Sequence, residues 1–215
     1  MVFKNSGRYS VPSDEGFEPD SNNEVIKNYL GVKSKEIMDE LEQSELKRTE
    51  LELVKFYGKD YQFKAEDICN IHELWLGDLY PMAGKYREVS MEKGGFLFAA
   101  SGQIEKLMLV LEKKYLKKYT PCHFTDSSQL AYALGMVHVE LILIHPFREG
   151  NGRVARLLAD LMAAQANMPP LNYMAIDQIE NPQGFERYIE AIHAGFNGDY
   201  LPIQNIFTTL LQQSV

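Results

Sequence analysis

The sequence has little cysteine and no long apolar run, and these two absences narrow its class. Only Cys69 and Cys122 occur, and neither has a partner at CxxC spacing, so a disulfide framework or a zinc knuckle is not expected. No run of 18 or more apolar residues is present, and the amino terminus lacks a basic segment followed by an apolar one. We therefore expect a cytoplasmic protein with free thiols and no membrane association.

Positive charge is also scarce. The 215 residues include 22 Lys and Arg against 30 Asp and Glu, which gives a formal net charge of −8. Proteins that bind duplex nucleic acid as their main ligand usually present a basic face. The short basic stretches, Lys113-Lys114 and Lys117-Lys118, alternate with apolar and aromatic residues and indicate the solvated side of a helix. We therefore do not expect nucleic acid as a partner.

The remaining composition is typical of a globular protein, with 45% hydrophobic and 24% charged residues. A length of 215 residues fits one domain with an extension, or at most two small domains. Residues 1–22 are rich in Ser, Asn, Gly, Pro and Asp, so we expect a flexible or loosely docked arm. A helical extension over 23–64 and a main domain over 65–215 are expected to follow.

Apolar periodicity, caps and breakers predict a mainly helical chain. The pattern becomes helical at Asn23 with a break at Gly31, and Ser34 can cap a longer helix that ends near Tyr57. That helix is expected to pack on the core or, alternatively, to bind a partner. Further helices are predicted over 65–79, 101–118, 127–144, 151–167, 181–194 and 200–213. The convincing β signal is at 86–98, where two short runs flank a Lys-Gly-Gly turn and predict a hairpin.

Two of these helices, 127–144 and 151–167, are apolar on nearly every side and should be buried. In the second helix, Arg153, Arg156 and Asp160 lie at i, i+3 and i+7 and share one face. Arginine on a buried helix is costly unless it is paired. These side chains therefore require an anionic partner, which is either an internal carboxylate or a ligand.

The two buried helices are joined by a motif that combines a base, a carboxylate and a glycine turn: His145-Pro146-Phe147-Arg148-Glu149-Gly150-Asn151-Gly152-Arg153-Val154-Ala155-Arg156. The turn lets the backbone approach a ligand closely, and the helix that begins there offers unpaired N–H groups and its positive dipole end. Such a helix start is a general anion site, and two arginines strengthen it. The motif therefore predicts a phosphate site.

Glu149 and His145 add chemistry to that site. A carboxylate beside arginines and a phosphate is best explained as a Mg²⁺ ligand, because Mg²⁺ favours one or two carboxylates together with phosphate oxygens. His145 can act as a base at neutral pH and deprotonate a hydroxyl that attacks a phosphorus held in the turn. Each feature alone is often structural, but their occurrence within twelve residues favours a functional interpretation.

The motif resembles the signature of the Fic (Fic/Doc) family, His-Pro-Phe-x-(Asp/Glu)-Gly-Asn-Gly-Arg-x-x-Arg, and fills every specified position. Residues 76–87 and 94–99 resemble the family's segment before its β-hairpin flap and the flap itself. Residues 188–191 and 198–202 resemble its closing segment. The resemblance covers roughly Ala65 to Ile206 and implies an all-α fold, a Fic-type helical bundle with one short β-hairpin.

Most family members with the full motif transfer AMP from ATP to a Tyr, Thr or Ser hydroxyl of a target protein. The resemblance implies that His145 is the general base and that Glu149 holds Mg²⁺. It also implies that Phe147 packs inward and anchors the loop. The phosphates of ATP would be bound by a set consisting of Gly150, Asn151, Gly152, Arg153 and Arg156.

The resemblance also suggests how a target is held. An extended target segment could pair with one edge of the flap through backbone hydrogen bonds, which ignore side-chain identity. The flap residues expected to take part are Lys93, Gly94, Gly95 and Phe96. Tyr188 is expected either to stack on the adenine or to pack in the core.

Regulation is not readable from a motif. Many family members carry an inhibitory helix, (Ser/Thr)-x-x-x-Glu-(Gly/Asn), whose glutamate pairs with the second motif arginine, here Arg156. Gly or Asn follows Glu only at Glu15, Glu149 and Glu180, and none has Ser or Thr four positions earlier. Control could come from a separate antitoxin chain, from self-association, from a degenerate helix within residues 23–57, or be lacking.

Two other functions stay open. One is a different transfer on the same scaffold, of UMP, phosphocholine or phosphate, or removal of AMP, which uses the same residues. Kinase-like members usually carry Lys at the position of Gly152, so they fit less well. The other is a non-catalytic nucleotide-binding interaction module. His145 and Glu149 argue against it, because binding alone needs no base.

Overall fold

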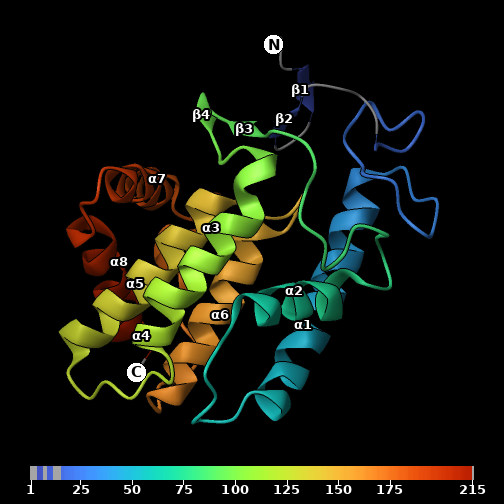
Figure 1. The fold of residues 1–215 in the computed structure, drawn as a ribbon. Helices are drawn as coiled ribbons and strands as arrows, with labels where there is room; N and C mark the ends of the chain where they lie inside the picture. Colours follow the sequence, from blue (N-terminus) through green and yellow to red (C-terminus); the bar gives the residue numbers. More distant parts are fainter. Residues whose placement is uncertain (1–3, 7–8, 12–15, 215) are drawn as a thin grey trace.

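The computed structural model describes residues 4–6, 9–11 and 16–214, and it confirms a mainly helical protein (Figure 1). The α-helices are α1 (Lys35–Phe56), α2 (Ala65–Leu76), α3 (Ile104–Val110), α4 (Lys117–Tyr119), α5 (Ser127–Ile144), α6 (Asn151–Gln165), α7 (Pro182–Phe196) and α8 (Leu201–Gln213). Short helical segments of other types are η1 (Ser101–Gln103), the π-helical η2 (Leu111–Leu116) and η3 (Tyr173–Ile176). The strands are β1 (Lys4–Ser6), β2 (Tyr9–Val11), β3 (Glu92–Lys93) and β4 (Phe96–Leu97).

Helix α5 is the centre of the bundle, as its apolar sequence predicts. It packs against α6, α7 and α8, and its N-terminus is capped by the Asp126 carboxylate, which accepts from the Gln129 N–H at 2.8 Å. It is also the one described helix long and apolar enough to cross a membrane, with a mean hydropathy of 1.4. Because 61% of it is buried inside the protein, its burial is that of a core helix.

Helix α1 begins and ends within a residue of its predicted limits, and Ser34 caps it by accepting from the Ile37 N–H. The prediction that the chain becomes helical at Asn23 and breaks at Gly31 is wrong, because residues 23–34 form turns and a single β-bridge. The Asn28 side chain bonds the backbone of its own neighbours, which offers this short segment an alternative to helical hydrogen bonds.

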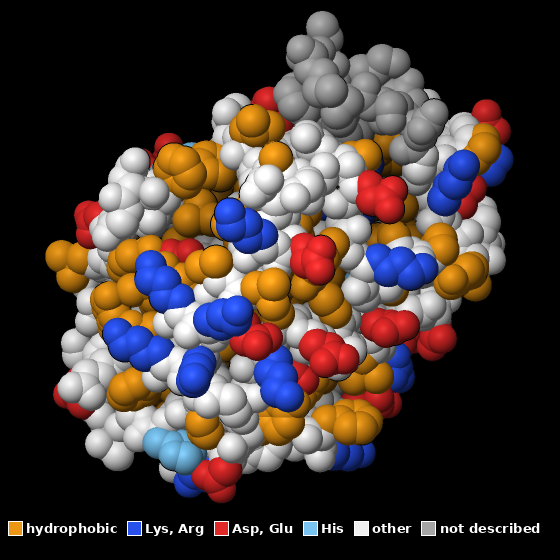
Figure 2. Space-filling model, in the orientation of Figure 1, with side chains coloured by type: hydrophobic (Ala, Val, Ile, Leu, Met, Phe, Trp, Pro, Cys, Tyr) orange, Lys and Arg blue, Asp and Glu red, His pale blue; other side chains and the backbone are white. Residues whose placement is uncertain are grey.

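The predicted helix over 101–118 is present but irregular, since it passes from 3₁₀ through α to π geometry. Its lysines at 113, 114, 117 and 118 are exposed while Tyr115, Leu116 and Tyr119 are buried, which confirms a solvated basic side. On the face drawn in Figure 2, basic side chains over this helix are separated by apolar and polar ones. They do not join into a continuous basic surface on that face.

The predicted hairpin is confirmed, with Gly94 and Gly95 at φ 57° and 81°, values that a two-residue type I′ turn requires. The hairpin does not stand alone. The described parts of the amino-terminal arm form β1 and β2, and the antiparallel sheet has the order β1-β2-β3-β4 (Figure 1). The other residues of that arm, 1–3, 7–8 and 12–15, lie outside the described residues.

A small apolar cluster fixes the arm to the flap. Phe17 packs with Met91 and Phe98, and all three are buried. Strand β2 meets β3 through the pair Ser10 and Glu92. One edge of the flap is therefore covered by the chain's own β2, and β4 is the outermost strand at the other side of the described sheet. Sequence patterns did not predict this pairing because three-residue strands carry almost no periodic signal.

Candidate active site

The motif forms the connection between α5 and α6, so the fold brings its parts together. Helix α5 ends at Ile144, and His145 takes the left-handed conformation that ends the helix, with φ 52° and ψ 60°. Helix α6 begins at Asn151 after Gly150, which has φ 79°. The first turn of α6 and its positive dipole end therefore face the loop that contains Glu149.

Asn151 and Phe147 give the loop its shape. The Asn151 side chain accepts from the Phe147 N–H and donates to the Phe147 carbonyl, each at 2.8 Å. Phe147 is fully buried and its ring stacks on His72 at 3.9 Å. The inward packing of Phe147 is thus present, and the contacts of Asn151 describe a loop-shaping role. Direct phosphate binding by Asn151 stays a prediction.

His145 lies beneath the flap with its ring held on two sides. Its Nδ1 is 3.2 Å from the Ile142 carbonyl, so Nδ1 donates and Nε2 carries the lone pair. Its ring stacks on Phe98 at 3.7 Å, and 4% of the residue is exposed. Burial, with smaller contributions from the positive charges of Arg87 and Lys93, lowers the pKa of His145 to about 3, although the hydrogen bond to the Ile142 carbonyl acts in the opposite direction. The neutral form, which can accept a proton, therefore dominates at neutral pH.

The two motif arginines share one face of α6 but have different partners. Arg153 forms ion pairs with Glu42 at 2.6 Å and with Glu149 at 3.3 Å, and its guanidinium lies 4.4 Å from the Trp75 ring. Arg156 lies 5.1 Å from the Tyr173 ring. An internal carboxylate therefore accounts for part of the pairing that Arg153 requires. Glu42, the carboxylate on α1, pairs with the first motif arginine, Arg153, rather than with the second, Arg156.

Glu149 offers one carboxylate at the start of α6. Its Oε1 accepts from the Gly150 N–H at 2.8 Å, and its side chain is 14% exposed. Within the described residues, no group of three His, Cys, Asp or Glu side chains forms a complete metal site. A single carboxylate fits Mg²⁺ when phosphate oxygens and water supply the remaining ligands.

The flap covers the site and rests on α7. Lys93 lies over the Phe185 ring at 5.9 Å, and Phe96 stacks on His193 at 4.8 Å. The predicted flap residues Lys93, Gly94, Gly95 and Phe96 therefore lie together, although they do not themselves stack on His145. Phe98, two residues beyond Phe96 and just after β4, does so.

Tyr188 lies in the core. It is 6% exposed, and its hydroxyl is 2.8 Å from His138 Nε2. His138 Nδ1 contacts the Ala155 carbonyl at 3.3 Å, so this pair ties α7 to α5 and α6. These contacts favour the packing alternative, and adenine stacking by Tyr188 stays a prediction without support from them.

Sequence reasoning missed several residues that shape the site. His72 joins α2 to the motif loop, because its Nε2 donates to the Glu149 carbonyl at 3.1 Å and its Nδ1 accepts from the Gly84 N–H at 2.8 Å. Arg87 holds the carbonyl of His145, and Glu42 holds Arg153. His72 and Arg87 lie close to predicted apolar segments, which was the only signal of their burial. Their partners could not be predicted, because these lie 77 and 58 residues away in the chain.

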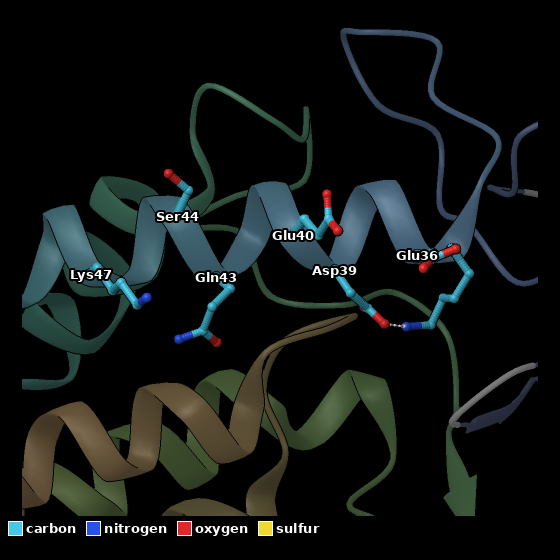
Figure 3. Close-up of a pocket in the computed structure, with 7 residues that line it drawn as sticks. Glu36, Asp39, Glu40, Gln43, Ser44 and Lys47 are labelled. Atoms are coloured by element: carbon cyan, nitrogen blue, oxygen red, sulfur yellow. Dashed lines mark hydrogen bonds and ion pairs between the residues drawn. The ribbon is translucent and has the colours of Figure 1, made fainter.

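A groove of about 780 Å³ runs along α1, lined by side chains from Lys35 to Lys47 (Figure 3). Lys35 and Asp39 form an ion pair across one helical turn. The groove is lined by charged, amide and hydroxyl side chains of this one helix, and none of them belongs to the motif. The motif loop, where a base, a carboxylate and two arginines converge, is therefore the better candidate site.

Comparison with known proteins agrees with the motif. A model of the Fic/DOC family matches residues 62–163. Two relatives are protein adenylyltransferase VbhT of Bartonella schoenbuchensis, 27% identical over 188 residues, and protein adenylyltransferase Fic of Nematostella vectensis, 27% identical over 187. The alignments cover 86% and 83% of this chain but 37% and 39% of those proteins, so the chain spans about two fifths of their length.

Solved structures share the fold. BepC from Bartonella tribocorum with bound AMPPNP has a TM-score of 0.72 at 21% identity, covering 92% of this chain and 96% of that one. The N-terminal Fic domain of a VirB-translocated Bep effector protein from Bartonella quintana, with bound ADP, has a TM-score of 0.73 at 22% identity, covering 91% and 93%.

A shorter relative gives the family assignment its firmest support. A Fido domain-containing protein of Dictyostelium discoideum is 36% identical over 110 residues, which make up 50% of this chain and 74% of that protein. The family match spans α2, the flap, α5 and most of α6, the elements that build the motif loop and its cover. The chain belongs to the Fic/DOC family.

Proposed function

We propose that this protein transfers AMP from ATP to a Tyr, Thr or Ser hydroxyl of a target protein. The observation that carries the proposal is the position of His145, a neutral base at the end of α5. It lies in the same loop as Glu149, and this loop leads into α6 with its two arginines. A base is needed for transfer and not for binding alone. The names of the relatives VbhT and Fic, both protein adenylyltransferases, support the same reaction.

The start of α6 is the proposed phosphate site. The amides of Gly150, just before α6, and of Asn151 and Gly152 in its first turn would bind the triphosphate, and Arg153 and Arg156 would neutralise its charge. Glu149 would hold Mg²⁺, which would supply charge neutralisation of the phosphates when bound. The nucleotides bound to the two similar structures from Bartonella, AMPPNP and ADP, support ATP as the co-substrate.

The chemical step follows from the His145 ring. Its Nδ1 is committed to the Ile142 carbonyl, so Nε2 would accept the proton of the target hydroxyl. The hydroxyl oxygen would attack the α-phosphorus, a new P–O bond would form, and the bond to the β-phosphate would break. Pyrophosphate would leave with its charge neutralised by the arginines.

The partners and surroundings of the protein are part of the same proposal. The partner is a target protein with an exposed Tyr, Thr or Ser, and the reaction is proposed to take place in the cytoplasm. A separate antitoxin chain or self-association is a proposed means of control. The ion pair between Glu42 of α1 and Arg153 keeps the alternative of a degenerate inhibitory helix open.

The test uses ATP labelled at the α- or the γ-phosphate, a cell lysate and mass spectrometry of labelled peptides. We expect label from the α position only, and a loss of at least about a hundredfold in His145→Ala, the range of general base catalysis. His123→Ala is the matched control, because His123 is an exposed histidine bonded to Lys59 outside the motif. Label from the γ position, or full activity in His145→Ala, would contradict the proposal.

A further inference from the structure

The segment between α2 and the flap carries a buried arginine, Arg87, that holds several backbone carbonyls at once. Arg87 is 4% exposed. Its Nε donates to the His145 carbonyl at 2.7 Å, and its Nη2 also lies 3.4 Å from the Ile144 carbonyl. Its own backbone N–H donates to the Pro146 carbonyl at 2.8 Å. One residue therefore binds three consecutive carbonyls where α5 ends and the motif begins.

The same guanidinium also holds both ends of the flap. Its Nη1 donates to the Val89 carbonyl and its Nη2 to the Ala99 carbonyl, each at 2.5 Å. Val89 precedes β3 and Ala99 follows β4. A planar fork with donors on three nitrogens can span these groups, and the negative end of the α5 dipole favours a cation there. The side chain of Arg87 thus forms hydrogen bonds both to the flap and to His145.

This arrangement sets the position of the His145 ring. Phe98 directly precedes the tethered Ala99 and stacks on His145 at 3.7 Å. His145 is also one of five described non-glycine residues with positive φ, a conformation that needs support from its surroundings. Arg87 supplies that support at the His145 carbonyl while it places Phe98 against the ring.

We propose that Arg87 is a positioning residue that fixes the flap relative to His145, so that a hydroxyl presented along the flap meets Nε2. The inference rests on the proposed AMP transfer. None of the carbonyls that Arg87 holds belongs to α6, where the phosphates are proposed to bind. The residue should therefore affect the transfer step and leave nucleotide affinity nearly unchanged.

The experiment compares Arg87→Lys, which keeps the charge but loses the planar fork, with Arg87→Met, which keeps the stem alone. We expect kcat for target labelling to fall about tenfold in the first and about a hundredfold in the second, the cost of misplaced reacting groups. The ATP dissociation constant should stay within about twofold of wild type, since uniform binding is not removed. Arg187→Met, at an exposed arginine of α7, is the control and should match wild type.

Hydrogen exchange gives a readout that does not depend on activity. The Phe98 N–H donates to the Met91 carbonyl at 3.1 Å, and we expect its exchange to accelerate in both Arg87 variants while exchange in α8 is unchanged. Unchanged flap exchange, kcat within about twofold of wild type, or a loss confined to ATP affinity would overturn the proposal. If wild type transfers no label, the proposed function fails, and flap exchange in Arg87→Lys still decides the positioning role. The same variant decides it if Arg87→Met does not fold.

Discussion

Three buried histidines differ in role, and the contacts of their ring nitrogens show the difference. Each uses one ring nitrogen toward a backbone carbonyl: His72 toward Glu149, His138 toward Ala155 and His145 toward Ile142. In His72 and His138 the second nitrogen meets an internal donor, the Gly84 N–H and the Tyr188 hydroxyl. Those two are structural. His145 is the one in the motif loop, beneath the flap.

Gly150 and Gly152 also differ in role, although they are of the same type and only two positions apart. A Cβ added at Gly150 would lie 2.5 Å from Trp75 Cζ3, on a backbone with φ +79°, whereas a Cβ at Gly152 would meet nothing within 4 Å. The first glycine is required by close packing against α2. The second stands in the first turn of α6, where its backbone amide and not its conformation is the proposed function.

Alanine substitutions at these two glycines should therefore have different effects on the unfolding free energy. Gly150→Ala should lower the unfolding free energy by at least about 2 kcal/mol, through strain and a clash with a fully buried ring. Gly152→Ala should leave it unchanged or raise it by up to about 1 kcal/mol, because alanine favours a helix over glycine. Urea unfolding measures both. Equal effects at the two positions would show that the turn does not depend on its contact with Trp75.

At the scale of elements, one edge of the flap, which is predicted to pair with a target segment, is already paired with another strand of the chain. Strand β3 has one neighbour in β4 and another in β2, so the edge that carries Glu92 is occupied by residues of the same chain. In an antiparallel ladder, a residue that does not bond its neighbour on one side directs its N–H and carbonyl to the other side. A target segment that pairs with this edge has to replace Ser10.

Replacing Ser10 by proline tests this competition. Proline removes the N–H that β2 would donate to the flap, whereas Ser10→Ala keeps it and serves as the control. We expect the KM for the target to fall on the order of threefold in Ser10→Pro, because the intramolecular strand no longer reduces the binding-competent fraction. Steady-state labelling at saturating ATP measures the change. Identical KM values in both variants would indicate that targets use the β4 edge at Leu97 instead.

For the whole molecule, burial of ionisable groups couples stability to pH. Burial lowers the pKa of His72 to about 4 and that of His138 and His145 to about 3, below the ordinary 6.5. Burial raises the pKa of Asp160 to about 6. Near pH 5 these three histidines are therefore protonated in the unfolded chain and neutral in the folded protein, a difference of three protons. Asp160 has the opposite effect, because it is protonated in the folded protein and ionised in the unfolded chain.

The net uptake on unfolding is therefore about two protons, and stability should fall as pH falls. The histidine contribution is complete above pH 6.5 and is lost as pH falls toward 3 to 4. We expect the unfolding free energy to be about 4 kcal/mol lower at pH 5 than at pH 7. Urea unfolding across this range measures the slope. His138→Asn should remove one histidine's share, and an unchanged slope in that variant would contradict the assignment.

Much of the architecture could be predicted because it depends on neighbours in the sequence. The apolar run of α5, the Ser34 cap of α1 and the Gly94-Gly95 turn each specify a local conformation. The motif could also be recognised from the sequence, since His145 and Arg156 are only eleven positions apart in the chain. Local chemistry alone therefore predicted a base beside a phosphate site.

The sequence by itself determined that a base, a carboxylate and two arginines would meet between two buried helices, because twelve consecutive residues carry them. Tertiary structure alone decided what holds these groups in place. Glu42 reaches Arg153, His72 reaches Glu149 and Arg87 joins the flap to His145, although each pair is far apart in the chain. Such contacts depend on packing of whole elements, and no periodicity or cap encodes them.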